Sequence, residues 1–383
     1  MNLAATPESC PHRPPCPACP RFGEPGLALK VRGALDTLAV RHGVTDVSLI
    51  SGDTAGFRHR ARLAIRGRLG SPKMGLFELG SHRVVHIPHC SVQHPLINRV
   101  AAIVRRALVD ARVTSYSDAA HLGLARYLQV VVERRSQTAQ VVLVANSETP
   151  QPLQGAFDLI RERLGGELHS LWFNAHCGRG NTILGAEFRH QFGPVSVIEH
   201  FGGAGVHYPP GAFGQSNLEI AELLIAQVRT QIPAGARVAE FYAGVGAIGL
   251  SMLDRVSHIR MNELSPASLQ GLALGIAELE SGQRGKIKVI PGSAGSAHSA
   301  ASGVEVVIVD PPRKGLDDEL VDVLSADSPE RLLYVSCGIE SLIKDAARLI
   351  SRGKLRLAAL TAFNLFPFTD HVETLARFER VRG

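Results

Sequence analysis

The chain of 383 residues lacks the features that mark membrane and secreted proteins. No apolar run approaches the roughly 20 residues that a transmembrane helix needs. The first 20 residues contain no hydrophobic stretch of the kind found in a secretory signal. Internal repeats are also missing, and compositional bias is confined to a proline-rich N-terminus. We therefore expect a cytoplasmic protein that does not enter a membrane.

The length and the charge of the chain indicate the number of domains and the kind of partner. A chain this long exceeds what one ordinary hydrophobic core can hold, so it predicts two domains. Hydrophobic residues form 45% of the sequence and charged residues 20%, which is typical of a soluble globular protein. The formal net charge of +6 favours a polyanionic partner, although this signal alone has little specificity.

Cysteine is scarce and unevenly distributed. The six cysteines are Cys10, Cys16, Cys19, Cys90, Cys177 and Cys337. The first three share residues 10–19 with several prolines, which exclude a regular helix there. In a cytosolic protein such a rigid loop predicts metal binding rather than disulfides. Cys90 is the best candidate for a fourth ligand, and either zinc or a 4Fe–4S cluster would accept four thiolates.

The first half of the sequence mixes helix and strand patterns. Residues 27–42 have apolar side chains at helical spacing. Residues 57–68 read as a strand whose apolar face carries Ala61, Leu63 and Ile65 and whose other face carries Arg58, Arg60, Arg62, Arg66 and Arg68. Because like charges in line repel one another, this arginine face predicts an anionic partner, although a solvated outer face would have the same pattern. The mixed patterns up to about residue 200 predict an α+β domain.

The second half alternates strand and helix patterns, which is typical of a cofactor-binding α/β fold. The strand at residues 238–242 leads into Gly244, Gly246 and Gly249, spaced as in a dinucleotide-binding turn. Glu263 ends the next strand, where an acid can hold ribose hydroxyls. These features favour an adenosine cofactor but do not separate NAD from S-adenosylmethionine.

Three later segments place reactive side chains at strand ends. Asp310-Pro311-Pro312-Arg313-Lys314-Gly315 follows a buried strand, and Cys337 follows the strand at residues 332–336. His371 and Glu373 lie near the end of the chain, again beside a loop. Ligands of open α/β sheets bind at the carboxyl ends of the strands, so these side chains are candidates for a common site. By itself, Cys337 would more commonly be a buried, unreactive thiol.

Together these motifs resemble the S-adenosylmethionine-dependent RNA uracil-5 methyltransferases. The matching pieces are Phe213-Gly214-Gln215-Ser216-Asn217, Phe241-Tyr242-Ala243-Gly244-Val245-Gly246, the Asp310-Pro311-Pro312 segment, Ser336-Cys337, and Phe366-Pro367 with His371-x-Glu373. The N-terminal cysteines also fall where that family carries a 4Fe–4S cluster. The chain lacks the TRAM domain with which the long forms begin. It therefore resembles the short forms that modify 23S ribosomal RNA.

The resemblance implies a role for each matching residue. Cys337 would add to C6 of the uracil as the nucleophile, and Glu373 would remove the C5 proton as the general base. The expected cofactor contacts are Gln215, Tyr242, Glu263, Asp310, Gly244 and Gly246. The expected cluster ligands are Cys10, Cys16, Cys19 and Cys90. We expect RNA contacts from Arg58, Arg60, Arg62, Arg66, Arg68 and Arg313.

A few positions depart from the family pattern. Gly338 and Ile339 stand where the family usually has Asn and Pro after the nucleophile, and the glycine is expected to loosen the loop that aims Cys337. Glu240 replaces the more usual Asp of the first strand, and Ser293 stands where an acid often lies near the adenine. None of these changes removes a group that the reaction needs.

The sequence therefore predicts an α/β protein of three parts. Residues 1–25 with the Cys90 region would form the iron–sulfur loop, residues 26–200 a central α+β RNA-binding domain, and residues 201–383 a Rossmann-like class I methyltransferase domain with a seven-stranded, mostly parallel sheet. We expect a monomer that acts on ribosomal RNA, with tRNA as the alternative substrate. A methyltransferase acting on a DNA or protein amine and an RNA-binding protein with a vestigial cofactor site are the competing hypotheses.

Overall fold

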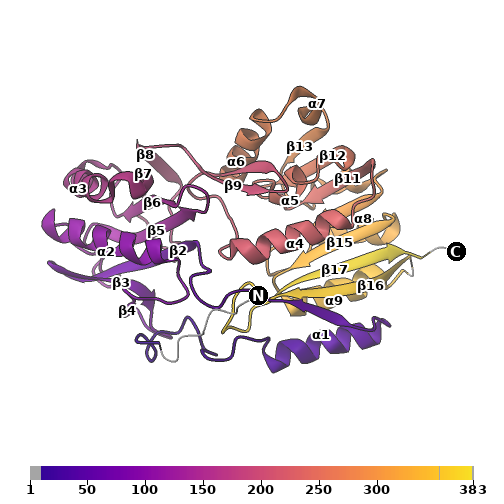
Figure 1. The fold of residues 1–383 in the computed structure, drawn as a ribbon, viewed down its shortest axis with the longest axis horizontal. Helices are drawn as coiled ribbons and strands as arrows, with labels where there is room; N and C mark the ends of the chain where they lie inside the picture. The colour runs from indigo at the N-terminus through magenta and orange to yellow at the C-terminus, as the bar shows by residue number, and fades with distance from the viewer. Residues whose placement is uncertain (1–9, 353, 382–383) are drawn as a thin grey trace.

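A computed structural model of the protein describes residues 10–352 and 354–381. Its fold contains two large β-sheets that lie side by side, one from the first half of the chain and one mainly from the second half (Figure 1). A two-stranded hairpin follows the first sheet in the chain, with strands β9 (Val197–Phe201) and β10 (Ala204–Tyr208). None of the helices in the described part combines the length and apolar character of a membrane span.

The first sheet has seven strands in the order β4-β3-β2-β5-β6-β7-β8, and all neighbours except β6 and β7 are antiparallel. The strands are β2 (Arg60–Arg68), β3 (Ser71–Phe77), β4 (Val84–His86), β5 (Ala125–Glu133), β6 (Thr138–Ala145), β7 (Leu168–Ala175) and β8 (Glu187–Phe192). Helices α2 (Pro95–Asp110) and α3 (Gln154–Leu164) pack on one face. Short 3₁₀ turns, η1 (Gln151–Leu153) and η2 (Gly165–Glu167), flank α3. The mixture of helices and antiparallel strands is the expected α+β arrangement.

The second sheet has eight strands in the order β1-β16-β17-β15-β14-β11-β12-β13. They are β1 (Val47–Ile50), β11 (Ala236–Phe241), β12 (Val256–Glu263), β13 (Ile287–Pro291), β14 (Val306–Val309), β15 (Arg331–Ser336), β16 (Leu355–Phe363) and β17 (Glu373–Arg380). Strand β17 is antiparallel to both of its neighbours, and the other pairs are parallel. The seven strands from the second half confirm the predicted mostly parallel, Rossmann-like sheet.

Helices cover both faces of this second sheet, because its inner strands alternate between two apolar cores. Val238 of β11 packs in the core under α4 (Leu218–Thr230), α5 (Ala247–Leu250) and α6 (Pro266–Ala277). Ala239, the next residue, packs in the opposite core with α1 (Leu29–Arg41), α8 (Asp318–Ala326) and α9 (Ile339–Ile350). The short helix α7 (Ser281–Arg284) precedes β13, and the 3₁₀ turn η3 (His298–Ala301) precedes β14.

Residues 29–50 pack with the second sheet, although the sequence analysis grouped them with residues 26–200. Strand β1 pairs in parallel with β16, and α1 lies on the same face of the sheet as α9. The apolar residues Val31, Leu35 and Leu38 of α1 are buried there, as their helical spacing predicts. That spacing shows which side of a helix is buried but not which sheet buries it.

The two sheets meet where β2 begins. His59 donates its backbone N–H to Ser216 O at 2.8 Å, and its own carbonyl accepts from Val132 N at 2.8 Å. Arg58 forms isolated β-bridges with Gln93 on one side and Asn217 on the other. The segment before α4, which contains Gln215, is therefore attached directly to the first strand of the other sheet.

Candidate active site

One cavity of about 1130 Å³ lies at the carboxyl ends of β11, β12, β14 and β15. This is the edge of the sheet at which ligands of open α/β folds bind. The predicted site residues that line the cavity are Gln215, Tyr242, Gly244, Glu263, Asp310, Arg313, Cys337 and Glu373. Gly246 is not among the lining residues; it stands at the start of α5 in a left-handed conformation. The structure thus brings residues from six separate segments into one site.

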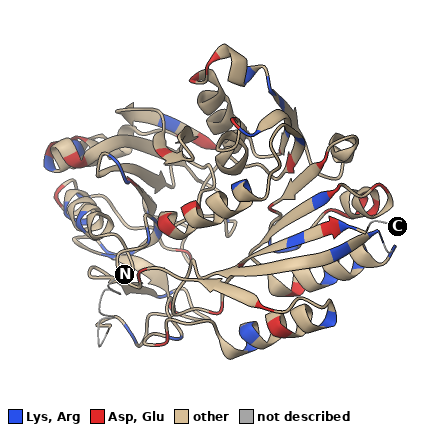
Figure 2. Cartoon of the chain, turned by 45° about the vertical axis from the view of Figure 1, so that its right-hand side comes forward, with Lys and Arg blue, Asp and Glu red and all other residues tan. Residues whose placement is uncertain are grey.

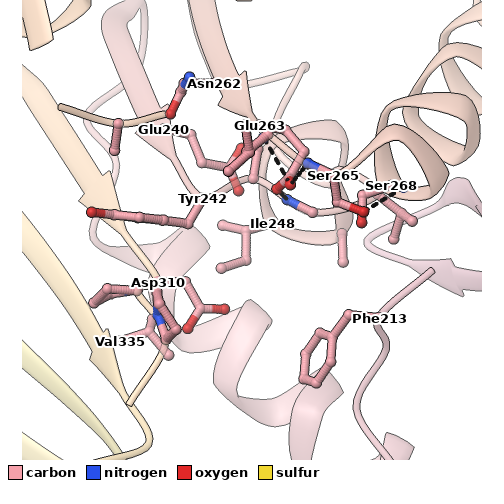
Figure 3. Close-up of a pocket in the computed structure, with 18 of the residues that line it drawn as sticks. Phe213, Glu240, Tyr242, Ile248, Asn262, Glu263, Ser265, Ser268, Asp310 and Val335 are labelled. Carbon is pink, nitrogen blue, oxygen red and sulfur yellow. Dashed lines mark hydrogen bonds between the residues drawn. The ribbon is translucent and has the colours of Figure 1, made fainter. Parts of the chain in front are cut away.

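The glycine-rich turn is fixed by Glu263, which ends β12. One carboxylate oxygen accepts the backbone N–H of Gly244 at 2.7 Å, and the other accepts those of Leu264 and Ser265 at 2.9 and 2.6 Å (Figure 3). Gly244 has a φ of 58°, a left-handed conformation that glycine adopts without strain. Each carboxylate oxygen has two lone pairs, so Glu263 can hold the turn and still accept from a ligand hydroxyl.

Glu240 is a site residue to which the sequence analysis assigned no role. Its side chain lines the cavity and is 2% exposed, and its Oε2 has no hydrogen-bond partner among the described residues. Burial, and then the charge of Asp310, raise the pKa of Glu240 well above its usual value. A Cβ on Gly249 would lie 2.2 Å from this Oε2, so the third glycine of the turn makes room for the carboxyl. The signal that could have identified Glu240 from the sequence is an acidic residue within the otherwise apolar strand at residues 238–242.

Asp310, Cys337 and Glu373 come together because their strands are neighbours. Asp310 follows β14, Cys337 follows β15, and Glu373 is the first residue of β17. Burial and the charge of Glu263 raise the pKa of Asp310 to about 7, and burial and the charge of Asp310 raise that of Glu373 to about 8. Glu373 is 4% exposed, and its Oε2 has no hydrogen-bond partner in the described chain.

The thiol of Cys337 is held in its protonated form by these neighbours. Burial, and then the charges of Glu373 and Asp310, raise its pKa to about 11. Arg313 acts in the opposite direction, as expected, but its effect is outweighed. Lys314, the other expected cation, pairs instead with Asp317 at 2.8 Å. A ligand that brings positive charge into the cavity would favour the thiolate.

The glycine after Cys337 is more restrained than its sequence suggests. Gly338 donates its N–H to Ser336 Oγ at 3.2 Å, and its carbonyl accepts from the hydroxyls of Ser336 and Ser341, both at 2.9 Å. Its φ of −138° and ψ of 110° are extended values open to any residue. The expected loosening of this loop is therefore offset by two serine hydroxyls.

The four N-terminal cysteines lie around one small hollow, which is separate from the large cavity. Cys10, Cys16, Cys19 and Cys90 all line it. Burial, and then the nearby Cys90, Cys16 and Cys10 thiols, raise the pKa of Cys19 to about 11. Within residues 10–352 and 354–381, no group of three or more His, Cys, Asp or Glu side chains is arranged to hold a metal ion. The four cysteines thus share one hollow without forming such a group in the described part of the chain.

The predicted arginine face is not an open surface. Arg66 is 7% exposed and forms a bidentate ion pair with Asp118, at 2.6 and 2.9 Å. Arg60 donates to Ala212 O at 2.8 Å, and Arg62 donates to Gln129 Oε1 at 2.8 Å. The guanidinium of Arg58 lies over the ring of Phe366, and Arg68 alone of the five is exposed. Acidic and basic residues are interspersed over both halves of the chain (Figure 2).

Comparison with known proteins places this site in a family. The model of the tRNA (uracil-5-)-methyltransferase family matches residues 298–381, which include Asp310, Cys337 and Glu373. An uncharacterized RNA methyltransferase of Protochlamydia amoebophila is 35% identical over 381 residues, covering 97% of this chain and 97% of its own. Another, from Thermosynechococcus vestitus, is 31% identical over 324 residues, covering 84% and 71%.

A solved structure shares the fold of nearly the whole chain. It is the Pyrococcus abyssi tRNA (uracil-54, C5)-methyltransferase in complex with S-adenosyl-L-homocysteine, with a TM-score of 0.76 and 20% sequence identity. The match covers 91% of this chain and 82% of the other. The sequence relatives extend the family assignment beyond the fold, because one of them matches from end to end. The chain belongs to the family of RNA uracil-5 methyltransferases.

Proposed function

We propose that this protein methylates C5 of a uridine in RNA, using S-adenosylmethionine as the methyl donor and a covalent bond between Cys337 and the uracil. The observation that carries the proposal is the meeting of a thiol and a buried carboxyl, Cys337 and Glu373, in one cavity beside the glycine-rich turn. A uracil C5 is a weak nucleophile until a thiolate has added to C6, and the C5 proton must later be removed.

The cavity suits an adenosine ligand that carries positive charge. Glu263 and the Gly244 turn would hold the ribose, while the carboxyls of Glu240 and Asp310 face the same space. Both have raised pKa values, so a cation near them would restore their charged forms. When bound, S-adenosylmethionine supplies a methyl group on a cationic sulfur.

The protein's residues perform the remaining steps. The thiolate form of Cys337 bonds to C6, which places the electron pair of the C5–C6 double bond in an enolate. After C5 has gained its methyl group, Glu373 accepts the C5 proton. The electrons of that C–H bond restore the C5–C6 double bond, and the C6–S bond breaks to return the thiolate. A carboxylate whose pKa is about 8 is well matched to this work near neutral pH.

We further propose 23S ribosomal RNA as the substrate, with tRNA as the alternative. The resemblance to the family members that modify 23S ribosomal RNA supports the former, and the tRNA substrate of the structural neighbour keeps the latter open. Mass-spectrometric mapping of 5-methyluridine in both RNAs from a deletion strain would separate them. Loss of the modification from tRNA alone would reject the ribosomal substrate.

We also propose that Cys10, Cys16, Cys19 and Cys90 hold a 4Fe–4S cluster, with zinc as the alternative. The support is the common hollow and the shared family position of these cysteines. A cluster binds one thiolate at each iron, whereas zinc needs all four sulfurs about 2.3 Å from one point. Protein purified without oxygen should be brown and contain iron. A colourless preparation that contains zinc would refute the cluster.

Removal of the nucleophile tests the proposed reaction. Cys337→Ala should lower the methylation rate by at least about 10⁴-fold, while binding of S-adenosylhomocysteine, measured by calorimetry, should persist. The exposed Cys177 provides a matched control, and Cys177→Ala should leave both quantities unchanged. RNA that contains 5-fluorouridine should trap a covalent adduct with the wild-type protein. Full activity of Cys337→Ala, or no adduct, would favour an enzyme that methylates an amine.

A further inference from the structure

The loop that leads to Glu373 is held by the segment that carries the N-terminal cysteines. We call residues 364–372, between β16 and β17, the base loop, because Glu373 follows it directly. The backbone N–H of Arg21 donates to Phe368 O at 2.9 Å. The guanidinium of Arg21 donates to Thr369 O at 3.2 Å. Arg21 stands two positions after Cys19, so one residue links the cysteine loop to the base loop.

Packing strengthens this attachment. Phe368 is fully buried, and its ring lies 5.0 Å from that of Phe22. Cys19 and Cys90 pack in the same small apolar cluster. The backbone of Phe368 has a φ of 68°, which a side chain of this size tolerates only when its surroundings enforce it. The cysteine loop supplies much of that enclosure.

Arg21 is itself well fixed. Its side chain is 19% exposed and also donates to Gly26 O at 3.0 Å. A second contact to the base loop is an exposed ion pair. Lys30 pairs with Asp370 at 2.7 Å, and the two side chains are 72% and 40% exposed. Such an exposed pair contributes little, whereas Arg21 satisfies carbonyl groups from two segments.

Glu373 stands where the base loop enters β17, and its backbone pairs with Phe363 of β16 at the other end of that loop. Its Oε2 has no hydrogen-bond partner among residues 10–352 and 354–381, so no side chain orients that atom. We infer that Arg21 is a positioning residue for the proton-removal step, because it anchors the base loop that sets Glu373 over the C5 hydrogen. This inference rests on the proposed function. It assigns the cysteine loop a part in catalysis that does not involve electron transfer.

The chemistry of the step provides a distinctive readout. When Glu373 is misplaced, the C5 proton stays, the C6–S bond cannot break, and the methylated RNA remains attached to Cys337. Misplacement by about 1 Å can slow a step on the order of 100-fold. A purely structural role for Arg21 would instead lower the amount of folded protein without retaining RNA on the cysteine.

The test compares Arg21→Ala, Arg21→Lys and Lys30→Ala. With ordinary uridine RNA, Arg21→Ala should slow product release about 10- to 100-fold and accumulate a protein–RNA adduct that survives denaturing electrophoresis. With 5-fluorouridine RNA, adduct formation should stay near the wild-type rate, because fluorine at C5 prevents the later step in every variant. Arg21→Lys should recover part of the release rate, and Lys30→Ala should match the wild type.

The possible outcomes separate the inference from the proposed function. Thermal unfolding and S-adenosylhomocysteine binding first establish that each variant is folded. If folded Arg21→Ala releases product normally, or slows without retaining RNA while Glu373→Gln does retain it, the inference is wrong and the proposed function stands. If wild-type protein forms no adduct with 5-fluorouridine RNA, the proposed function itself fails.

Discussion

Two buried charged sites, one in each half of the molecule, satisfy their polar atoms in opposite ways. In the first half, Arg66 is buried with two hydrogen bonds to Asp118 and two to backbone carbonyls. In the second half, Glu240 and Glu373 are buried with one oxygen each that finds no partner in the described chain. A buried polar atom without a partner is unfavourable, so the difference separates a residue kept for stability from residues kept for a ligand.

The contrast between Arg66 and the two acids also corrects the expectation that the arginine face of residues 57–68 binds an anionic partner. Arginine beside RNA and carboxylate beside a cationic cofactor are both reasonable from charge alone. Arg66 also lies over the rings of Phe77, Tyr116 and Tyr127, which leaves its guanidinium enclosed. The acids, in contrast, face a large cavity. Whether a buried charged group can interact with a ligand therefore depends on whether other protein groups already satisfy its hydrogen bonds, and not on its charge alone.

The largest effect on stability should follow the loss of the paired arginine. Arg66→Ala removes one side of a buried ion pair and should lower the free energy of unfolding by about 3 kcal/mol, because Asp118 is left without its cation. This loss of free energy is near the low end for buried ion pairs, because the side chain of Asp118 is 27% exposed. Arg68→Ala, on an exposed residue of the same strand, should change it by less than about 0.5 kcal/mol. If urea unfolding shows that the two substitutions lower the free energy of unfolding equally, the difference proposed between the buried Arg66 and the exposed Arg68 is wrong.

The acids of the cavity should make stability depend on pH. A carboxyl whose pKa is raised on folding binds its proton more tightly in the folded state. The folded protein therefore carries more protons than the unfolded chain once the pH exceeds the ordinary carboxyl pKa. The free energy of unfolding then falls as the pH rises from about 4.5 through the folded pKa values of Asp310 and Glu373, about 7 and about 8.

The Glu240→Gln variant isolates the contribution of one residue to the pH dependence of the free energy of unfolding. The amide resembles the protonated carboxyl and does not titrate. As the pH rises above the ordinary glutamate pKa, the free energy of unfolding should therefore fall more steeply for the wild type than for the variant. Urea unfolding at several pH values gives the difference, and Glu330→Gln, at an exposed acid, is the control. Parallel curves for wild type and Glu240→Gln would mean that Glu240 is charged in the folded state.

Sequence patterns predicted the second sheet better than the first. Apolar strands that end in Gly, Asp or Cys identify the carboxyl edge of a parallel sheet, and Cys337 and Glu373 meet there. Two-residue alternation placed Ala61, Leu63 and Ile65 in the core but assigned Arg66 to an open face. Its partner Asp118 is 52 residues away, and no local pattern reveals such a pair. Burial of the carboxyl Glu240 and the raised pKa of Cys337 likewise depend on neighbours from other strands.

The smallest expected effect concerns Gly338, which follows Cys337 directly. It stands at the N-cap of α9, and no side chain among the described residues caps that helix. Gly338→Asn would supply a cap, which should raise the free energy of unfolding by a few tenths of a kcal/mol, about 0.3. An added Cβ would lie 2.8 Å from Ser341 Oγ, so that hydroxyl must rotate and give up one hydrogen bond to the Gly338 carbonyl. Because Ser336 still holds the loop, methylation should change less than about threefold, measured beside the unfolding midpoint. A large loss of activity without a loss of stability would show that Ser341, rather than Ser336, aims Cys337.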